Sequence, residues 1–343
     1  MLLIGNRCPI IRGRKGVNQP TPNSPQQILT NAILKWQPAS LVSLYSGGYD
    51  SAVTTHLLHT LDTHGLPIHV AAIDTQLAAD GWRDYVQSVA DKQGWDFKIY
   101  SSDKAWRQFL TLVIHQGCPK TRPMHTFVFQ KLKGRVIEAI HMAQKERLKL
   151  ERASIRTSER VLDELSKKER SIWGMSDGEI RSAKTLFVSG MRRAESSFRK
   201  EAAEVQRIGH SNRIFAAPIV HWSQEDCDLY RVESGLLDNP FYGTVKGSGD
   251  CQCNWGNFIS LATLRKHSPQ LAGGNVALID KLSKDLHGFG WDSRDVVAQA
   301  PLIASEIEEA KSTTPFLCQG CSRAKVRAPA VAVESRLLQQ GLF

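Results

Sequence analysis

The stretch Leu41-Val42-Ser43-Leu44-Tyr45-Ser46-Gly47-Gly48-Tyr49-Asp50-Ser51 carries the strongest signal of fold class in this chain. Its apolar first half predicts a buried strand, and a helical pattern over 51–64 follows the glycines at once. In such a strand-loop-helix unit, the glycines let backbone N–H groups close on an anion, the serine hydroxyls add donors, and the helix presents its positive end. The plain alternative is a glycine turn that merely joins a strand to a helix. We expect a phosphate-binding loop made of Ser46, Gly47, Gly48, Tyr49, Asp50 and Ser51.

Strands and helices alternate outward from this loop. Strand-like runs are each followed by a helical pattern, and two further strand-like runs come later; in order, these segments are 68–74, 81–94, 97–100, 105–116, 186–189 and 213–220. The alternation predicts an α/β fold, in which a parallel sheet carries helices on both faces in a Rossmann-like arrangement. Open sheets of this kind bind ligands at the carboxyl ends of their strands, so we expect the loop at that edge.

Three regions are expected along the chain. Residues 1–38 combine basic residues and prolines, which predicts a lightly ordered basic arm that ends in a first helix near 26–36. Residues 39–222 form the α/β domain, and a charged helical insertion over 143–183 interrupts it. Residues 223–343 are expected to form a smaller, cysteine-rich region that a metal stabilises.

The composition limits the class of protein. The 343 residues, of which 41% are hydrophobic, suffice to bury a sizeable core. No stretch approaches the roughly 20 apolar residues of a membrane span, and basic residues interrupt the N-terminus before a signal-like segment develops. We therefore expect a soluble, cytoplasmic protein without membrane contact. The formal net charge of +10 favours a polyanionic partner, and DNA or RNA is the expected one.

The charged insertion is a second candidate for contact with nucleic acid. Leucine or isoleucine recurs every seventh residue at Leu148, Ile155 and Leu162, which predicts a helical hairpin or a coiled-coil arm. On a single helix, basic residues spaced by three or four fall on one face, and such a stripe can follow a phosphate backbone. This basic stripe consists of Lys145, Lys149, Arg152, Arg156 and Arg160. Acidic neighbours neutralise much of its charge, so a solvated helix is an equal alternative.

Two cysteine pairs predict a metal site. Cys251 and Cys253 are separated by one residue, and Cys318 and Cys321 form a Cys-x-x-Cys pair farther along the chain. Thiolates at these spacings can point at a common ion, and two pairs complete a site of four sulfurs that suits Zn²⁺ or a [4Fe–4S] cluster. Cys118 lies in a loop close to a lysine, and the hypothesis that it is a reactive thiol stays open.

Further segments join the loop in resembling one family. They are Ile73-Asp74-Thr75, Gly190-Met191-Arg192-Arg193-Ala194-Glu195-Ser196 with Arg199, Pro218-Ile219 with Trp222, and Asn239-Pro240-Phe241-Tyr242. With the Ser-Gly-Gly-x-Asp-Ser loop and in this order, they resemble the PAPS reductase-like ATP pyrophosphatases of the adenine nucleotide alpha hydrolase (PP-loop) superfamily. The resemblance covers about 41–258, apart from the insertion. The loop is not a Walker A loop, because the lysine and the longer glycine spacing are missing.

The resemblance implies that ATP and Mg²⁺ bind at this loop. Members of the family grip the β- and γ-phosphates of ATP, so that a nucleophile attacks the α-phosphate and pyrophosphate leaves. By this resemblance Asp50, Ser51 and Arg192 are the expected catalytic residues, and Asp50 would help to hold Mg²⁺. Asp74 would meet the adenosine side, with a helix cap as its alternative role, and Arg192 and Arg199 would meet phosphate or sulfate oxygens.

The cysteines distinguish the reactions known within the family. Reductases of the adenylylsulfate type carry adjacent cysteines and a later Cys-x-x-Cys that bind an iron–sulfur cluster. This likeness favours [4Fe–4S] here, and Zn²⁺ stays the alternative because one residue separates the first pair. These reductases also use a cysteine near the C-terminus, whereas residues 327–343 contain none. A reductase of adenylylsulfate or its 3′-phosphate is therefore the second choice of function.

The first choice is an ATP pyrophosphatase, which converts ATP to AMP and pyrophosphate and adenylates a substrate in nucleic-acid modification or sulfur transfer. In character the chain is similar to the ATP-using component of DNA phosphorothioation systems and to its phage-borne relatives. The partners implied are DNA or RNA, a cysteine desulfurase or another sulfur donor, and other subunits of a modification complex. A third hypothesis is a regulator that senses nucleotides and binds nucleic acid without catalysis.

Overall fold

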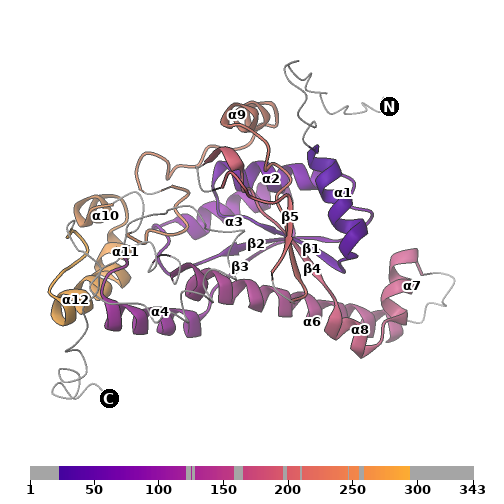
Figure 1. Cartoon of the computed structure of the whole chain (residues 1–343), viewed down its shortest axis with the longest axis horizontal. Coiled ribbons are helices and arrows are strands. Elements are labelled where there is room, and N and C mark those ends of the chain that lie inside the picture. The colour runs from indigo at the N-terminus through magenta and orange to yellow at the C-terminus, as the bar shows by residue number, and fades with distance from the viewer. Residues whose placement is uncertain are drawn as a thin grey trace.

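A computed structural model describes residues 23–120, 125, 128–157, 165–195, 199–208, 211–245, 247–254 and 259–293. This part of the chain is built on a six-stranded sheet with the strand order β3-β2-β1-β4-β6-β5 (Figure 1). The strands are β1 (Ser40–Leu44), β2 (Ile68–Ile73), β3 (Phe97–Tyr100), β4 (Thr185–Val188), β5 (Val205–Arg207) and β6 (Arg213–Ala216). Neighbouring strands pair in parallel, except that β5 is antiparallel to β6. The predicted α/β fold is confirmed, and the edge strand β5 is an addition to it.

Helices lie on both sides of the sheet (Figure 1). On one side are α1 (Pro25–Trp36), α2 (Tyr49–Thr60) and α3 (Trp82–Gln93), and on the other are α4 (Asp103–Gln116) and α6 (Arg135–Thr157). Successive side chains of a strand point to opposite faces, so Leu41 packs in a cluster with α1 and α2, whereas Val42 packs in a cluster with α6. Because both faces are covered, the strands read as continuous apolar runs in the sequence.

The strand order changes direction at β1. From β1 the chain adds β2 and β3 on one side, and later adds β4 and β6 on the other. The connection that leaves β1 therefore runs toward one edge of the sheet, and the connection that leaves β4 runs toward the other edge. Open α/β sheets bind ligands in the crevice between two such strands. Since residues 46–51 follow β1 closely, the topology places the predicted phosphate-binding loop at this crevice.

Local sequence fixes several helix ends. Ser24 and Gln27 form a capping box before α1, and Pro25 occupies the first turn, where its missing N–H does no harm. Gly94 ends α3 in the left-handed conformation, with φ at 66°. None of the helices in the described ranges is both long and apolar enough to cross a membrane.

The charged insertion folds as a helical arm. The π-helix η1 (Gln130–Gly134) runs directly into α6, and α7 (Lys167–Gly174) and α8 (Asp177–Ser182) pack back against α6. Leu148 is buried in a cluster with α8, and Ile155 in a cluster with α7, as the seven-residue spacing predicted for a helical hairpin. Leu162 lies outside the residues that the structure describes. Helix α6 begins before the predicted start of the insertion, so the arm extends a helix that packs on the sheet.

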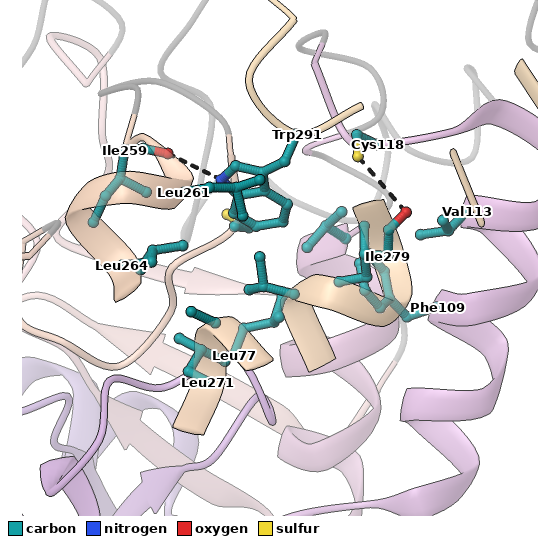
Figure 2. Close-up of a cluster of buried hydrophobic side chains, with 14 of the residues drawn as sticks. Leu77, Phe109, Val113, Cys118, Ile259, Leu261, Leu264, Leu271, Ile279 and Trp291 are labelled. Carbon is teal, nitrogen blue, oxygen red and sulfur yellow. Dashed lines mark hydrogen bonds between the residues drawn. The ribbon is translucent and has the colours of Figure 1, made fainter. Parts of the chain in front are cut away.

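The region after β6 contributes α9 (Gln224–Glu233), α10 (Leu261–His267), α11 (Pro269–Gly273) and α12 (Asn275–His287). Helix α9 packs on α2, and α12 packs on α4, with α11 and α10 stacked behind it. Figure 2 shows the core that results, in which Phe109 of α4 lies with Ile279 of α12 and with Trp291. Trp291 Nε1 donates a hydrogen bond to Ile259 O at 2.9 Å. An apolar core thus joins α10–α12 to the α/β domain.

Cys118 is part of this core. Its side chain is fully buried, and its Sγ lies 3.9 Å from Ile279 O, to which the thiol donates (Figure 2). Burial raises the pKa of the Cys118 thiol to about 11. Because the thiolate is the reactive form of cysteine, the hypothesis of a reactive Cys118 is wrong, and this side chain packs as a small apolar residue.

Candidate functional site

The loop after β1 turns too tightly for any residue but glycine at position 47. Gly47 has φ at +84°, and a Cβ there would lie 3.1 Å from Val86 and 3.2 Å from Trp82 Nε1. The left-handed backbone strains any other residue at this position, and a Cβ would be closer to its neighbours than in an ordinary contact. Gly48 is the N-cap of α2, and the first N–H groups of a helix have no partners within it. The loop therefore presents the positive end of α2 to an anion.

The two serine hydroxyls close the loop on itself. Ser51 Oγ donates to Gly48 O at 2.8 Å and accepts from Ser46 N at 3.2 Å. Ser46 Oγ lies 3.1 Å from Ser51 Oγ and accepts from Gly48 N at 3.3 Å. These bonds set the shape of the loop without help from a ligand, so little ordering is left for a phosphate to impose.

Three distant segments hold the loop from outside. Trp82 Nε1 and Asn239 Nδ2 donate to loop carbonyls, at 2.9 Å and 2.7 Å respectively. Gly190, which follows β4, passes so close to α2 that a Cβ there would lie 2.6 Å from the backbone of Asp50. Gly190 and Asn239 come from two of the segments that resemble the family, and the structure brings both to the loop.

Arg192 reaches the loop from the same segment as Gly190. Its guanidinium donates to Asp50 Oδ2 at 2.9 Å and to Gln224 Oε1 at 2.7 Å. The Arg192 side chain is 4% exposed and that of Asp50 is 21% exposed, so the cation lies behind the carboxylate. Within the described part of the chain, the buried Arg192 Nε has no hydrogen-bond partner. The predicted catalytic residues Asp50, Ser51 and Arg192 are thus brought together.

A cavity of about 400 Å³ opens at the loop. Its polar wall includes Ser46, Gly48, Asp50, Ser51, Glu195 and Arg199. Its apolar wall includes Leu44, Ala71, Ile73, Phe129, Ile137 and Met191. On the polar wall Arg199 forms an ion pair with Glu195. A concave site lined by both charged and apolar side chains suits a small molecule that has both characters.

Asp74 does not line this cavity, although Ile73 does. The Asp74 carboxylate pairs with Arg83 and accepts from Gln76 N at 2.7 Å, so it stabilises the turn after β2. The side chain is 5% exposed in this arrangement. The structure therefore gathers the loop, Arg192 and Arg199 but not Asp74, whose contact with adenosine stays a prediction.

An ion pair that sequence reasoning missed also lines the cavity. Lys133 Nζ lies 2.6 Å from Asp250 Oδ2, and Ser248 Oγ donates to Asp250 Oδ1 at 2.6 Å. Burial alone would lower the pKa of Lys133, but the Asp250 carboxylate raises that pKa above its ordinary value. Burial opposes the charge on Asp250 as well, yet Lys133 holds the pKa of Asp250 below its ordinary value. Both groups are therefore charged, and their separation of 117 residues left no local signal.

A stacked pair of tyrosines borders the same opening. The rings of Tyr49 and Tyr242 lie 4.3 Å apart with an angle of 8° between their planes. The Arg231 guanidinium lies 4.3 Å from the centre of the Tyr49 ring, which adds a cation–π contact. Tyr242 lines the cavity, and burial raises the pKa of its hydroxyl. The sequence singled out Tyr242 through the family resemblance but gave no sign of its contact with Tyr49.

The first cysteine pair follows directly on Asp250. A hydrogen bond with Cys253 lowers the pKa of Cys251 to about 6, against the opposing effect of burial. A thiol that ionises near neutral pH is suited to bind a metal. Cys318 and Cys321 lie outside the described residues, and within those residues no three His, Cys, Asp or Glu side chains are arranged to hold a metal ion. The four-cysteine site therefore stays a prediction.

The basic stripe makes contacts within its own arm. Lys145, Arg152 and Arg156 donate to backbone carbonyls at the ends of α8 and α7, at 2.6, 2.7 and 2.8 Å respectively. Cations placed there complement the negative ends of these helices. Lys149 pairs with Glu146 at 3.0 Å on the surface, and Arg160 lies outside the described residues. Contact between the stripe and nucleic acid stays a prediction.

Comparison with known proteins identifies the family of this fold and loop. The family model of the phosphoadenosine phosphosulfate reductase domain matches residues 40–253. This match takes in the phosphate loop, the Arg192 segment and the first cysteine pair, and the chain belongs to this family. The family resemblance drawn from the sequence is confirmed. No curated protein matches the chain.

Several solved structures resemble the chain at low identity. The phosphoadenylyl-sulfate reductase of Candida auris, in a phosphate complex, is 15% identical with a TM-score of 0.38, and the alignment covers 64% of this chain and 84% of that one. The NMN synthetase of Francisella tularensis is 11% identical with a TM-score of 0.36, over 81% of this chain and 97% of that one. The U34-tRNA thiolase of Methanococcus maripaludis, solved with its [4Fe–4S] cluster, is 12% identical with a TM-score of 0.34, over 81% and 84%.

Proposed function

We propose that the chain is an ATP pyrophosphatase, which splits ATP between the α- and β-phosphates and transfers AMP to an acceptor. The observation that supports this most is the preformed loop at the change of strand order, with Arg192 buried behind Asp50. The loop offers backbone N–H groups and the end of α2 to two phosphates. The adjoining cavity of about 400 Å³ has room for the rest of a nucleotide along its apolar wall.

In the proposed reaction a nucleophile of the acceptor attacks the α-phosphorus of ATP. The bond between this phosphorus and the oxygen that bridges to the β-phosphorus breaks, and pyrophosphate leaves with that oxygen and its electron pair. The proton of the nucleophile passes to solvent. The protein binds and orients the reactants. The loop holds the leaving pyrophosphate, the positive end of α2 offsets the charge that gathers on it, and Arg192 holds the Asp50 carboxylate in position.

Mg²⁺ is the cation expected with ATP, and Asp50 is suited to hold it. Carboxylate oxygens are preferred ligands of Mg²⁺. The Asp50 carboxylate lies on the cavity wall with 21% of its side chain exposed, while Arg192 fixes one of its oxygens from behind. A bound Mg²⁺ would neutralise part of the phosphate charge.

We propose nucleic acid as the class of acceptor, in a modification or sulfur-transfer reaction. The net charge of +10 supports contact with a polyanion, and the low pKa of Cys251 supports a thiolate or metal function next to the cavity. A sulfur-transfer reaction would also need a sulfur donor, such as a cysteine desulfurase.

The proposal is tested by identifying the products of ATP. The full chain, purified without oxygen, is incubated with Mg²⁺, ATP labelled at the α-phosphate, and separately with duplex DNA, single-stranded DNA or total RNA. We expect labelled AMP with an equal amount of pyrophosphate, and label on one class of nucleic acid before AMP is released. ADP with inorganic phosphate would contradict attack at the α-phosphate.

Two other results would select the alternative functions. Binding of ATP and nucleic acid without turnover in any mixture would favour the nucleotide-sensing regulator. The family match is the observation that favours the reductase. Release of sulfite from adenylylsulfate or its 3′-phosphate, with thioredoxin as reductant, would therefore replace the pyrophosphatase by a reductase.

A further inference from the structure

Three side chains that carry hydroxyl groups meet at Gly48 of the phosphate loop. A Cβ at Gly48 would lie 3.1 Å from Ser248 Cβ, 3.3 Å from Ser46 Oγ and 3.4 Å from the Tyr242 hydroxyl oxygen. All three side chains also line the cavity. Because Gly48 is the N-cap of α2, they surround the start of the helix, where backbone N–H groups can meet a phosphate.

The two serine hydroxyls use their protons inside the protein. Ser248 Oγ donates to Asp250 Oδ1 at 2.6 Å. Ser51 Oγ donates to Gly48 O, so Ser46 Oγ is the donor in the 3.1 Å contact between the two loop serines. A serine hydroxyl has only one proton to donate, and neither Ser46 nor Ser248 has another for a ligand.

The Tyr242 hydroxyl, in contrast, keeps its proton for another acceptor. Within the described residues no acceptor for this proton is found, whereas the backbone of Tyr49 offers the hydroxyl a hydrogen bond. A hydroxyl group that accepts a bond from an N–H group can still donate its own proton. Burial raises the pKa of the Tyr242 hydroxyl above its ordinary value, so the proton is present at neutral pH.

Contacts with the loop fix the place of Tyr242. Asn239 Nδ2 donates to Gly47 O at 2.7 Å and to Ser248 O at 3.1 Å, which ties the segment around Tyr242 to the loop. The Tyr242 ring stacks on the Tyr49 ring with their centres 4.3 Å apart. Tyr242 is nevertheless 43% exposed, so a ligand in the cavity can reach it.

We propose that the Tyr242 hydroxyl donates a hydrogen bond to the pyrophosphate part of ATP and so completes the phosphate site from outside the loop. The backbone N–H groups of α2 hold the β- and γ-phosphates from one side, and Tyr242 holds them from the side of Ser248. This inference rests on the proposed function, in which ATP binds at the loop. AMP lacks the β- and γ-phosphates, so the contact favours ATP and pyrophosphate over AMP.

The opposite role for the same hydroxyl is that of a shield. Because it lies against the backbone of Tyr49, it would then occupy the place of a phosphate oxygen, and ATP would have to displace it. The two roles predict effects of opposite sign. Loss of a donor weakens the binding of pyrophosphate, whereas loss of a shield strengthens it.

Tyr242→Phe separates the two roles, because phenylalanine keeps the ring on Tyr49 and removes only the hydroxyl. Isothermal titration calorimetry on the full chain, with Mg²⁺ present, measures the binding of pyrophosphate, of α,β-methylene ATP and of AMP. We expect the variant to bind pyrophosphate and the ATP analogue about 10- to 100-fold more weakly, the range for a hydrogen bond to a charged group. AMP should bind to the variant as it does to the wild type.

Tyr100→Phe is the matched control. It removes a tyrosine hydroxyl that lies 2.9 Å from His69 Nε2, and Tyr100 does not line the cavity. All three ligands should bind to this variant with wild-type affinity. The melting temperature of each variant shows that the folded proteins are being compared.

The proposal would be overturned by unchanged or tighter binding of pyrophosphate to Tyr242→Phe, and the tighter binding would make the hydroxyl a shield. An equal loss of affinity for AMP would also overturn it, because the contact would then not be with the β- and γ-phosphates. So would a wild-type chain that binds no pyrophosphate. These binding measurements are separate from the products of ATP, so a chain that binds pyrophosphate through Tyr242 but forms no AMP would contradict the proposed function alone.

Discussion

At Gly190 the chain that leaves β4 passes against the first turn of α2 with no room for a side chain. Two residues later Arg192 reaches Asp50 and donates to its carboxylate at 2.9 Å. The close approach of Gly190 to α2 therefore places Arg192 where its guanidinium can donate to the Asp50 carboxylate. The family resemblance pointed to Arg192, but only the structure shows that its partner is Asp50.

Gly190→Ala should destabilise the protein by about 1–3 kcal/mol, as overpacking does in a crowded interior. The new Cβ would lie 2.6 Å from the Asp50 backbone, which can move only if α2 shifts. Gly178→Ala is the control, because a Cβ at this α8 position would meet no atom closer than 3.7 Å. Helix propensity predicts equal or slightly greater stability for the control. Equal urea midpoints for the two variants would contradict the close approach at Gly190.

Asp50→Asn should lower the rate of AMP release by about 10²–10³-fold, because an amide holds Mg²⁺ more weakly than a carboxylate and less of the charge on the phosphates is then offset. The amide keeps the shape of the side chain and can still accept from Arg192, but the buried guanidinium loses its counter-charge, so the melting temperature should fall as well. Asp84→Asn, at an exposed position in the first turn of α3, should alter neither quantity. If Asp50→Asn released AMP at the wild-type rate, Asp50 would not be a catalytic residue.

At the scale of elements, α6 has two roles. Its first half packs on the sheet through Ile137 and Ile140, and its second half forms the arm with α7 and α8. His141 lies in the first half, where its Nδ1 is 2.8 Å from Thr185 Oγ1 of β4. A titratable group thus sits in the contact between a helix and the sheet.

The stability of the protein should fall as the pH is lowered from about 6.5 to about 4, because His141 titrates differently in the folded and unfolded states. Burial, and then the charges of Lys145 and Arg213, lower the pKa of His141 to about 4. In that range the unfolded chain binds a proton that the folded protein does not, so acid favours unfolding. Partial hydration should limit the effect to roughly 1–2 kcal/mol.

His141→Gln removes the titrating group and keeps a side chain that can bond to Thr185. The free energy of unfolding, measured with urea at several pH values, should therefore depend less on pH in the variant than in the wild type. Parallel curves for the two proteins would show that His141 is not the group responsible.

The arm offers one substitution that tests contact with nucleic acid without loosening the fold. Lys149 pairs with Glu146 on the surface, whereas Arg152 and Arg156 bind carbonyls at the ends of helices. If Lys149 contacts a phosphate, Lys149→Ala should weaken binding to every sequence alike and flatten the slope of log K against log salt by about 0.9 on duplex DNA. Glu146→Ala should not weaken binding. An unchanged slope for Lys149→Ala would favour the alternative hypothesis, in which this face of the helix is solvated and does not contact nucleic acid.

At the scale of the whole molecule, the fold followed from local patterns. Buried parallel strands leave continuous apolar runs, and the run before Ser46 together with the glycines located the loop. The edge strand β5 has only three residues of intermediate burial and left no such run. The sequence predicted a smaller C-terminal region from residue 223, and it gave no sign that Phe109 and Ile279 share one core between α4 and α12.

The parts of the site that were missed depend on contacts between distant segments. Lys133 and Asp250 are 117 residues apart. Lys133 lies in no pattern that distinguishes it from other polar residues, because its place at the cavity comes from the packing of η1 against the cysteine segment. Motifs located the loop and the Arg192 segment, whereas the part of the cavity wall that contains Lys133 and Asp250 could be found only from the three-dimensional structure.

Cleavage between the α- and β-phosphates is tested most directly with two analogues of ATP, each given with Mg²⁺ and the nucleic acid that supports the highest turnover. In one analogue a methylene group replaces the oxygen between the β- and γ-phosphates, which leaves the α–β bond cleavable. In the other it replaces the oxygen between the α- and β-phosphates. We predict AMP and methylenediphosphonate from the first analogue and no cleavage of the second. Inorganic phosphate from the second analogue, with the first left intact, would contradict the proposed reaction.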